Sequence, residues 1–130
     1  MILDKRDLAI KSIRPQLLDK ADNCASVEQF QNDTLYPIIR FQNSFVFAQF
    51  HGYVRKFKPA FNAYNQQTQR NYIQDVLRSD PRIRNSLIAT IVSMMTLEEY
   101  TFYCRHKVVV NIQIICLLTE RLQEHLELLY

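Results

Sequence analysis

Two glutamines in the first half of the chain, Gln42 and Gln49, interrupt a helix face that is otherwise apolar. They are seven residues apart, which places both on one side of a helix with about 3.6 residues per turn. A buried amide without hydrogen-bond partners costs about 1–3 kcal/mol, so both amides need partners. Two interpretations stay open. Either the amides bond to the backbone at a neighbouring helix end, or they line a small-molecule pocket, of a binding protein or an enzyme, together with Arg40 and Asn43.

Positive charge is concentrated in the middle of the chain, where residues 55–84 contain seven basic and two acidic residues. Residues 108–130, by contrast, contain one arginine and three glutamates. The basic residues with aromatic neighbours are typical of a surface that stacks single-stranded bases, and those after the Ser79-Asp80-Pro81 turn would open a recognition helix. The candidates for nucleic-acid contact are Arg55, Lys56, Lys58, Arg82 and Arg84. A solvated basic face is the favoured alternative, because the sequence after Asn85 is apolar enough for a buried helix.

Metal and covalent chemistry find little support in the sequence. The three histidines, His51, His106 and His125, form no HxxxH pair, and none follows an acidic residue by three positions. The spacing therefore lacks both the paired imidazoles of zinc sites and the ExxH ligands of di-iron bundles. Cys104 is two residues from His106, but a catalytic thiol needs a base oriented by a third group. We expect no metal, no cofactor and no catalytic residue, which favours a protein that is not an enzyme.

Cysteine usage and the first residues indicate a reducing compartment. Cys24, Cys104 and Cys116 are odd in number and widely spaced, which is not typical of a disulfide framework. Cys116 has apolar neighbours and is expected in the core. The first residues are charged from Asp4 onward, and no run of about 18 apolar residues exists. The sequence predicts a cytoplasmic protein without membrane contact.

Composition excludes folds that need many tight turns. The chain has 130 residues, 48% apolar and 22% charged, as one folded domain typically has. Its single glycine, Gly52, leaves no turn glycines for a barrel or sandwich and no glycine-rich phosphate loop. Eight Phe and seven Tyr residues supply the bulk of a core. We expect an all-α fold, a single compact irregular or orthogonal bundle of five to six helices over residues 1–130.

Apolar spacing of three and four residues places the helices. They are expected over about 4–20 with a kink at Pro15, from 26 onward, over 35–57, 66–78 and 81–95, from 96 onward, and over 108–128. Ser26 and Thr96 each begin a capping-box pattern, and Asp80 is expected to cap the helix that starts at Pro81.

A restart of the second helical region is expected near residue 33. Asp33 or Thr34 would act as its N-cap, which would leave Pro37 in the first turn, where its missing N–H is harmless.

The last expected helix, over residues 108–128, carries more apolar residues than one buried stripe requires. Ile114 and Leu117 widen its apolar face beyond the roughly 100° that a single core needs. Such a helix is either central in the bundle or shared with a partner. Because two-fold homodimers are the commonest assembly, we expect a homodimer with this helix in its interface.

The segment from Glu28 to Asn43, EQFQNDTLYPIIRFQN, resembles a pattern of an uncharacterised family of small all-helical Bacteroidetes proteins. Later segments fit the same pattern: Asp80-x-x-x-Arg84-Asn-x-Leu87, Thr96-x-Glu98-Glu99-Tyr100-x-x-Tyr103 and Arg121-Leu122. Phe41 stands where the pattern often has leucine. The resemblance, which covers nearly the whole chain, implies a compact helical cytoplasmic protein of unknown activity. Some members carry the label glyoxalase, but this sequence offers neither the strand-rich scaffold nor the His and Glu ligands of the metal-dependent glyoxalases.

Three functions follow, in order of preference. The first is a cytoplasmic helical protein that acts through protein–protein contacts, as a homodimer and with an unidentified protein partner. The second is nucleic-acid binding through residues 55–84. The third is a small-molecule or enzyme pocket around Gln42 and Gln49.

Overall fold

Helices form every regular element in the part of the chain that the computed structural model describes, residues 4–14 and 26–129. The α-helices are α1 (Lys5–Ile13), α2 (Val27–Phe30), α3 (Tyr36–Phe57), α4 (Gln66–Ser79), α5 (Pro81–Val92), α6 (Leu97–Arg105) and α7 (Lys107–Glu124). The shorter segments are a π-helical turn over Gln31–Leu35 and 3₁₀ turns over Pro59–Ala63 and Leu126–Leu129. Because the π turn joins α2 to α3 without a break, these residues contain six helices. The all-α prediction is confirmed.

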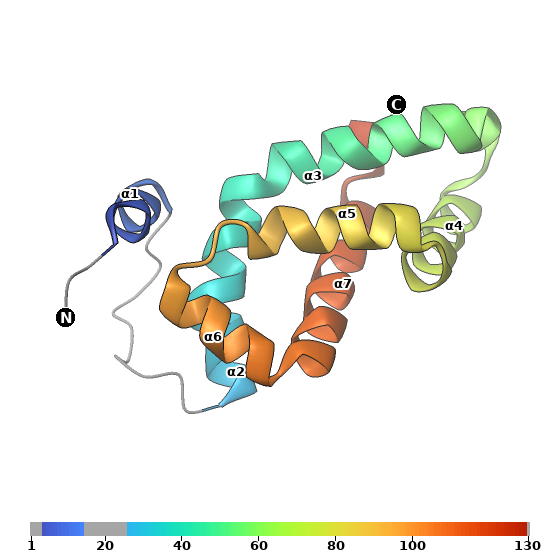
Figure 1. Ribbon diagram of the computed structural model, residues 1–130. Helices are drawn as coiled ribbons and strands as arrows, with labels where there is room; N and C mark the ends of the chain where they lie inside the picture. The colour runs from blue at the N-terminus through green and yellow to red at the C-terminus, as the bar shows by residue number, and fades with distance from the viewer. Residues whose placement is uncertain (1–3, 15–25, 130) are drawn as a thin grey trace.

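The longest helix, α3, runs along one side of the bundle. Figure 1 shows α5 beside it, with α4 near one end of this pair, α6 near the other and α7 crossing beneath. Large apolar side chains fill the space between the helices. Those with no more than 1% exposure include Phe30, Leu35, Ile38, Phe50, Phe61, Ile73, Leu77, Leu87, Ile91, Met95, Ile114 and Leu118. They belong to one continuous hydrophobic core.

The predicted restart at Asp33 or Thr34 is wrong. The helix runs on from α2 through the π turn, where the N–H of Tyr36 bonds to the carbonyl of Gln31. Neither residue acts as a side-chain cap for α3. Pro37 cannot donate to a carbonyl four residues earlier and would clash with it, so the wider π turn accommodates its ring.

The predicted caps at the other helix starts are present. Ser26 Oγ accepts the N–H of Gln29 at 3.1 Å. The capping box of α6 is complete, because Thr96 Oγ1 accepts the N–H of Glu99 and Glu99 Oε1 accepts the N–H of Thr96. Asp80 Oδ1 accepts the N–H of Arg82 at the start of α5, with Pro81 in the first turn. These signals depend on neighbours in sequence only, which is why the sequence predicts them.

The last helix is shorter than predicted. α7 ends at Glu124, because His125 leaves the helical region at φ −129° and ψ 52°. The chain then turns through Leu126–Leu129 and buries Leu126 and Leu129 against α3. Core burial of these two leucines therefore replaces the final turn of the predicted helix.

The burial of side chains on α7 also differs from the expectation of an unusually wide apolar face. Ile114 is fully buried and Leu117 packs half-buried against the core, whereas Ile112 is 53% exposed. The prediction that Cys116 lies in the core is wrong, because its side chain is exposed.

Some predictions lie outside the described residues, namely those on Pro15, on Cys24 and on the second half of the first predicted helix. Among the helices described, none combines the length and the apolar character that a membrane span needs.

Candidate functional site

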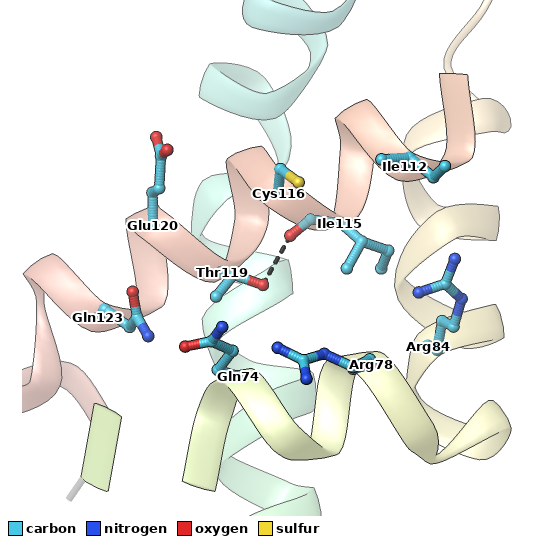
Figure 2. Close-up of a pocket in the computed structure, with 9 residues that line it drawn as sticks. All are labelled: Gln74, Arg78, Arg84, Ile112, Ile115, Cys116, Thr119, Glu120 and Gln123. Carbon is cyan, nitrogen blue, oxygen red and sulfur yellow. Dashed lines mark hydrogen bonds between the residues drawn. The ribbon is translucent and has the colours of Figure 1, made fainter. Parts of the chain in front are cut away.

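An open groove with a volume of about 440 Å³ lies between α4 and α7. Its walls come from three helices, with α5 contributing Arg84. The lining residues are Gln74, Arg78, Arg84, Ile112, Ile115, Cys116, Thr119, Glu120 and Gln123. Figure 2 shows Gln74 and Arg78 on α4 facing Thr119 and Ile115 on α7. The groove therefore combines an apolar wall on α7 with a polar wall on α4 and α5.

The charges that line the groove are predominantly positive. Arg84 donates from Nη1 to the Leu77 carbonyl oxygen at 3.2 Å, at the C-terminal end of α4. Arg78 is exposed and makes no ion pair with any described residue. Glu120 is the acidic member of the lining, and its carboxylate points away from Gln74 and Arg78 (Figure 2). Two guanidinium groups on one wall favour an anionic ligand.

Gln42 and Gln49 both face α5. Gln42 Nε2 donates to the carbonyl oxygen of Thr90 at 3.2 Å, and Gln49 Nε2 donates to Thr90 Oγ1 at 2.7 Å. The hydroxyl of Ser86 donates to Gln49 Oε1 at 2.5 Å. The two amides thus join α3 to α5 through both backbone and side-chain partners on that helix.

The other two candidates for this pocket, Arg40 and Asn43, lie apart from Gln42 and Gln49. Asn43 Oδ1 accepts from Arg121 Nε at 2.5 Å, which links α3 to α7 instead of α5. Arg40 is exposed. The structure therefore brings Gln42 and Gln49 together around Thr90 but places Asn43 and Arg40 elsewhere.

Basic and aromatic side chains gather where the end of α3 meets the start of α5. The guanidinium carbon of Arg82 lies 4.2 Å from the ring centre of Phe57, and Lys56 Nζ lies 5.3 Å from the same ring. Lys58 Nζ lies 5.8 Å from the ring of Tyr64 and 5.9 Å from that of Tyr72. We call these residues, with Tyr53, the basic–aromatic cluster.

The other two basic candidates lie apart from this cluster. Arg55 lines a separate hollow with His51, Asn62 and Leu129. Arg84 lines the groove described above. The structure thus unites three of the five predicted nucleic-acid residues and separates the other two.

Asp80 connects the basic–aromatic cluster to the cap of α5. Its carboxylate accepts hydrogen bonds from Arg82 Nε and Nη2 at 3.1 and 2.8 Å, and another from the hydroxyl of Tyr53. The bonds from Arg82, followed by that from Tyr53, hold the pKa of Asp80 far below its ordinary value. Burial and the bond to Asp80 raise the pKa of Tyr53 to about 12. The negative charge of Asp80 offsets the positive charge of Arg82 at this surface.

Replacing Asp80 with asparagine is expected to make the melting temperature less dependent on acidic pH. The unfolded carboxyl binds its proton near pH 4, above the lowered folded pKa, so the stabilisation is complete above about pH 5 and is lost as pH falls. Asparagine is also a good N-cap, so the helix start is retained. Thermal unfolding by circular dichroism between neutral and acidic pH measures the difference. Equal acid sensitivity of the two proteins would contradict the prediction.

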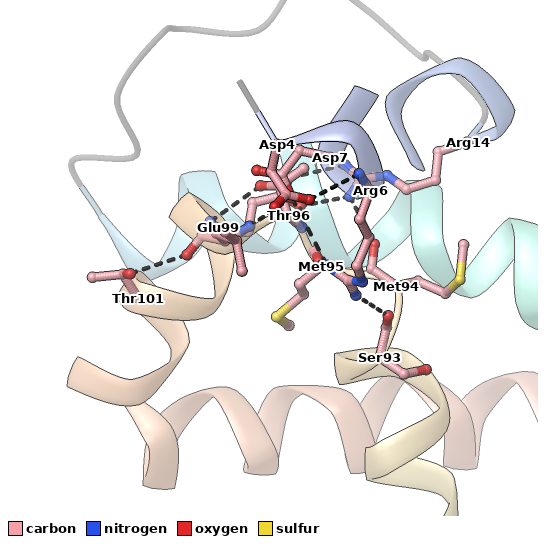
Figure 3. A network of polar contacts seen from close by, with 11 residues as sticks. Asp4, Arg6, Asp7, Arg14, Ser93, Met94, Met95, Thr96, Glu99 and Thr101 are labelled. Atoms are coloured by element: carbon pink, nitrogen blue, oxygen red, sulfur yellow. Dashed lines mark hydrogen bonds and ion pairs between the residues drawn. The ribbon is translucent and has the colours of Figure 1, made fainter. Parts of the chain in front are cut away.

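A polar network fastens α1 to the turn between α5 and α6 (Figure 3). Arg14 Nη1 and Nη2 donate to the two carboxylate oxygens of Glu99 at 2.5 and 2.9 Å, and the Arg14 side chain is only 1% exposed. Arg6 donates to the backbone carbonyls of Ser93 and Met95. Asp7 Oδ1 accepts the N–H of Leu97 at 3.0 Å. These contacts satisfy backbone groups of the turn, so the network has a structural role.

The histidines do not come together. His51 lines the hollow with Arg55, the ring of His106 lies 4.4 Å from that of Phe102, and the ring of His125 lies 6.2 Å from that of Phe47. Within residues 4–14 and 26–129, no three His, Cys, Asp or Glu side chains form a group that could hold a metal ion.

Sequence patterns do not predict the groove, although they contain a trace of it. Gln74 and Arg78 are one turn apart on α4, and Ile112, Cys116 and Glu120 are one turn apart on α7. Both stripes contain polar or charged residues, and each lies beside the buried apolar face of its own helix. Which stripes face each other depends on how the helices pack, and no spacing along the chain specifies that.

Comparison with known proteins gives no functional assignment for this chain. No family model, curated protein or solved structure matches this chain.

Proposed function

We propose that the protein acts through protein–protein contacts, as a homodimer that pairs through the outer face of α3. This face, called the α3 face, consists of Phe41, Phe45, Ala48, Gly52 and Lys56, all exposed and spaced three or four residues apart. Phe41 is 42% exposed and Phe45 is 56% exposed. The observation that carries the proposal is the exposure of two large aromatic side chains to solvent on the longest helix of the bundle.

The position of Gly52 supports the proposal. Glycine inside a helix costs about 1 kcal/mol relative to alanine, so a reason for its presence is needed. Its φ is not positive, and an added Cβ would meet no atom within 4 Å. Nothing within the described part of the chain therefore requires glycine here. A second helix approaching closely from outside would require it.

The α3 face is complementary to itself when two copies pair antiparallel. A two-fold axis near Ala48 brings Phe45 of one copy opposite Gly52 of the other, so that a ring enters the space that glycine leaves. The same pairing brings Phe41 opposite Lys56, whose ammonium group lies 5.3 Å from the Phe57 ring of its own chain and would then also lie against the Phe41 ring of the second copy. Each contact then occurs twice, as a two-fold interface requires. The α3 face alone is small beside interfaces of about 1,200–2,000 Å², so we expect modest affinity.

This interface differs from the one that the sequence suggests. Ile114 and Leu117, the residues that widen the predicted apolar face of α7, pack inside the same chain. Leu128, which follows α7 and is 54% exposed, is the natural residue for comparing the two interfaces.

Phe45→Asp is expected to convert the dimer into a monomer, because it places a carboxylate opposite an apolar notch. Light scattering coupled to size exclusion, over a hundredfold concentration range, measures the mass. Leu128→Asp is the matched control and is expected to leave the dimer intact. Gly52→Leu is expected to weaken the dimer while leaving the melting temperature of the monomer unchanged or higher, since its side chain enters open space.

Monomeric mass of the unmodified protein across the whole concentration range would refute the proposed dimer. Dissociation by Leu128→Asp with no effect of Phe45→Asp would instead place the interface at the end of α7.

Nucleic-acid binding takes second place, on physical grounds. A base that stacks on Phe57 must displace Arg82 or Lys56, which already lie against that ring. Asp80 offsets the charge of Arg82, and such binding depends mainly on positive charge that is free to meet phosphate. The basic–aromatic cluster is therefore better explained as the joint between α3 and α5.

A further inference from the structure

We infer that the groove between α4 and α7 binds a small amphipathic carboxylate, with its acid group at Arg78 and Arg84 and its apolar body along Ile112 and Cys116. The site is separate from the α3 face and does not depend on the proposed dimer. Its size is suitable, because a volume of about 440 Å³ lies within the roughly 300–1,000 Å³ of small-molecule sites.

The apolar wall of the groove is uncovered. Ile112 is 53% exposed and Cys116 is exposed, whereas Ile114, Ile115 and Leu118 on the same helix are buried. Ile115, 7% exposed, forms the adjoining surface one residue before Cys116. Thr119 donates its hydroxyl proton to the carbonyl oxygen of Ile115 at 2.7 Å, so it has no donor left for the carboxylate of a ligand at this end. An apolar group placed here would remove side-chain surface from water.

The polar wall has unused hydrogen-bond donors. Arg84 donates one Nη1 bond to Leu77, and Arg78 makes no ion pair with a described residue. Arginine donors in a fixed planar fork match the two oxygens of a carboxylate. Because two positive groups share one wall, a single anion between them also reduces their mutual repulsion.

The groove suits a small ligand better than a docked chain. Its walls are helices whose backbone N–H and C=O groups are already paired, so it offers no edge to an extended peptide. Gln123 donates Nε2 to the carbonyl oxygen of Arg70 at 3.0 Å and lies at the end of the groove away from Arg84 (Figure 2). Charge at one end and an uncovered apolar surface beside it match one molecule with one acidic group.

Three probes with the same alkyl chain test the inference: decanoate, decanamide and decylamine. Each is titrated below its micellisation concentration into isotope-labelled protein, and the backbone amide NMR signals are followed. Decanoate is expected to shift signals of α4 and α7 around residues 74–78 and 112–123 in a saturable manner. Decanamide, which lacks the charge, is expected to bind at least about tenfold more weakly, and decylamine more weakly still.

Two exposed arginines provide the matched variants. Arg78→Gln is expected to weaken decanoate binding about tenfold and decanamide binding by a much smaller factor, because the amide loses a hydrogen bond but no charge pairing. Arg55→Gln, in the separate hollow, is expected to change neither. Ile112→Asn is expected to weaken decanoate and decanamide alike, because it alters the apolar wall.

Equal affinity for decanoate and decanamide, or equal effects of Arg78→Gln and Arg55→Gln, would overturn the inference. So would signal shifts confined to residues outside the groove, including the α3 face. Thermal unfolding of each variant confirms that it is folded, and both arginines are exposed.

Discussion

Replacing Glu99 with alanine is expected to lower the free energy of unfolding by about 3–5 kcal/mol, because it leaves a buried guanidinium without its counter-charge. Arg14 is 3% exposed and forms two hydrogen bonds to the Glu99 carboxylate. The same carboxylate accepts from the Thr34 hydroxyl at 3.1 Å and from the Thr96 N–H at 2.9 Å. One side chain therefore joins α1, the π turn and the cap of α6. Urea unfolding at neutral pH measures the loss.

Two further variants separate the contribution of the Glu99 charge from that of its hydrogen bond in the α6 capping box. Glu99→Gln keeps an oxygen for the Thr96 N–H but removes the charge, so it is expected to retain part of the lost stability. Adding Arg14→Met to Glu99→Gln removes the uncompensated cation and is expected to be more stable than Glu99→Gln alone. A loss below about 1 kcal/mol for Glu99→Ala would contradict the assigned role of the ion pair.

Local signals explain what the sequence predicts correctly. Ser26, Asp80 and Thr96 begin helices because their side chains bond to N–H groups two or three residues later. Apolar spacing likewise places α3, α4 and α5 close to their observed bounds. These features are determined by neighbours on the same stretch of chain, so one sequence is enough to predict them.

Long-range contacts explain the errors. Thr34 matches the N-cap pattern, but its hydroxyl donates to Glu99 and its helix continues. The last helix breaks at His125 because Leu126 and Leu129 are buried against α3. In both cases the decisive partner lies far away along the chain, and local propensity gives no information about it.

The candidate sites follow the same division. Seven-residue spacing correctly places Gln42 and Gln49 on one helix face, and Thr90 of α5 provides partners for both. Positive charge between residues 55 and 84 is visible in composition, yet packing sends Arg82 to Phe57 and Arg84 to the groove. A charge count therefore shows how many arginines are available but not which surface each one serves.

Phe50→Ala is expected to lower the free energy of unfolding by about 3–5 kcal/mol, because it removes a fully buried ring and leaves a cavity. Phe50 is 0% exposed and its ring lies 6.0 Å from that of Tyr53. Phe45→Ala is the matched control on the same helix, since Phe45 is 56% exposed. It is expected to change the stability of the monomer by less than about 0.5 kcal/mol.

The comparison also separates the two roles that aromatic residues have on α3. Urea unfolding at protein concentrations too low for dimerisation measures folding alone, and light scattering at high concentration measures association. Phe50→Ala should reduce stability at every concentration, whereas Phe45→Ala should act only where the dimer forms, through the pairing of Phe45 with Gly52 of the second copy. A large loss of monomer stability in Phe45→Ala would mean that the Phe45 ring stabilises the fold of its own chain. That result would contradict the proposal that the α3 face is a dimer interface.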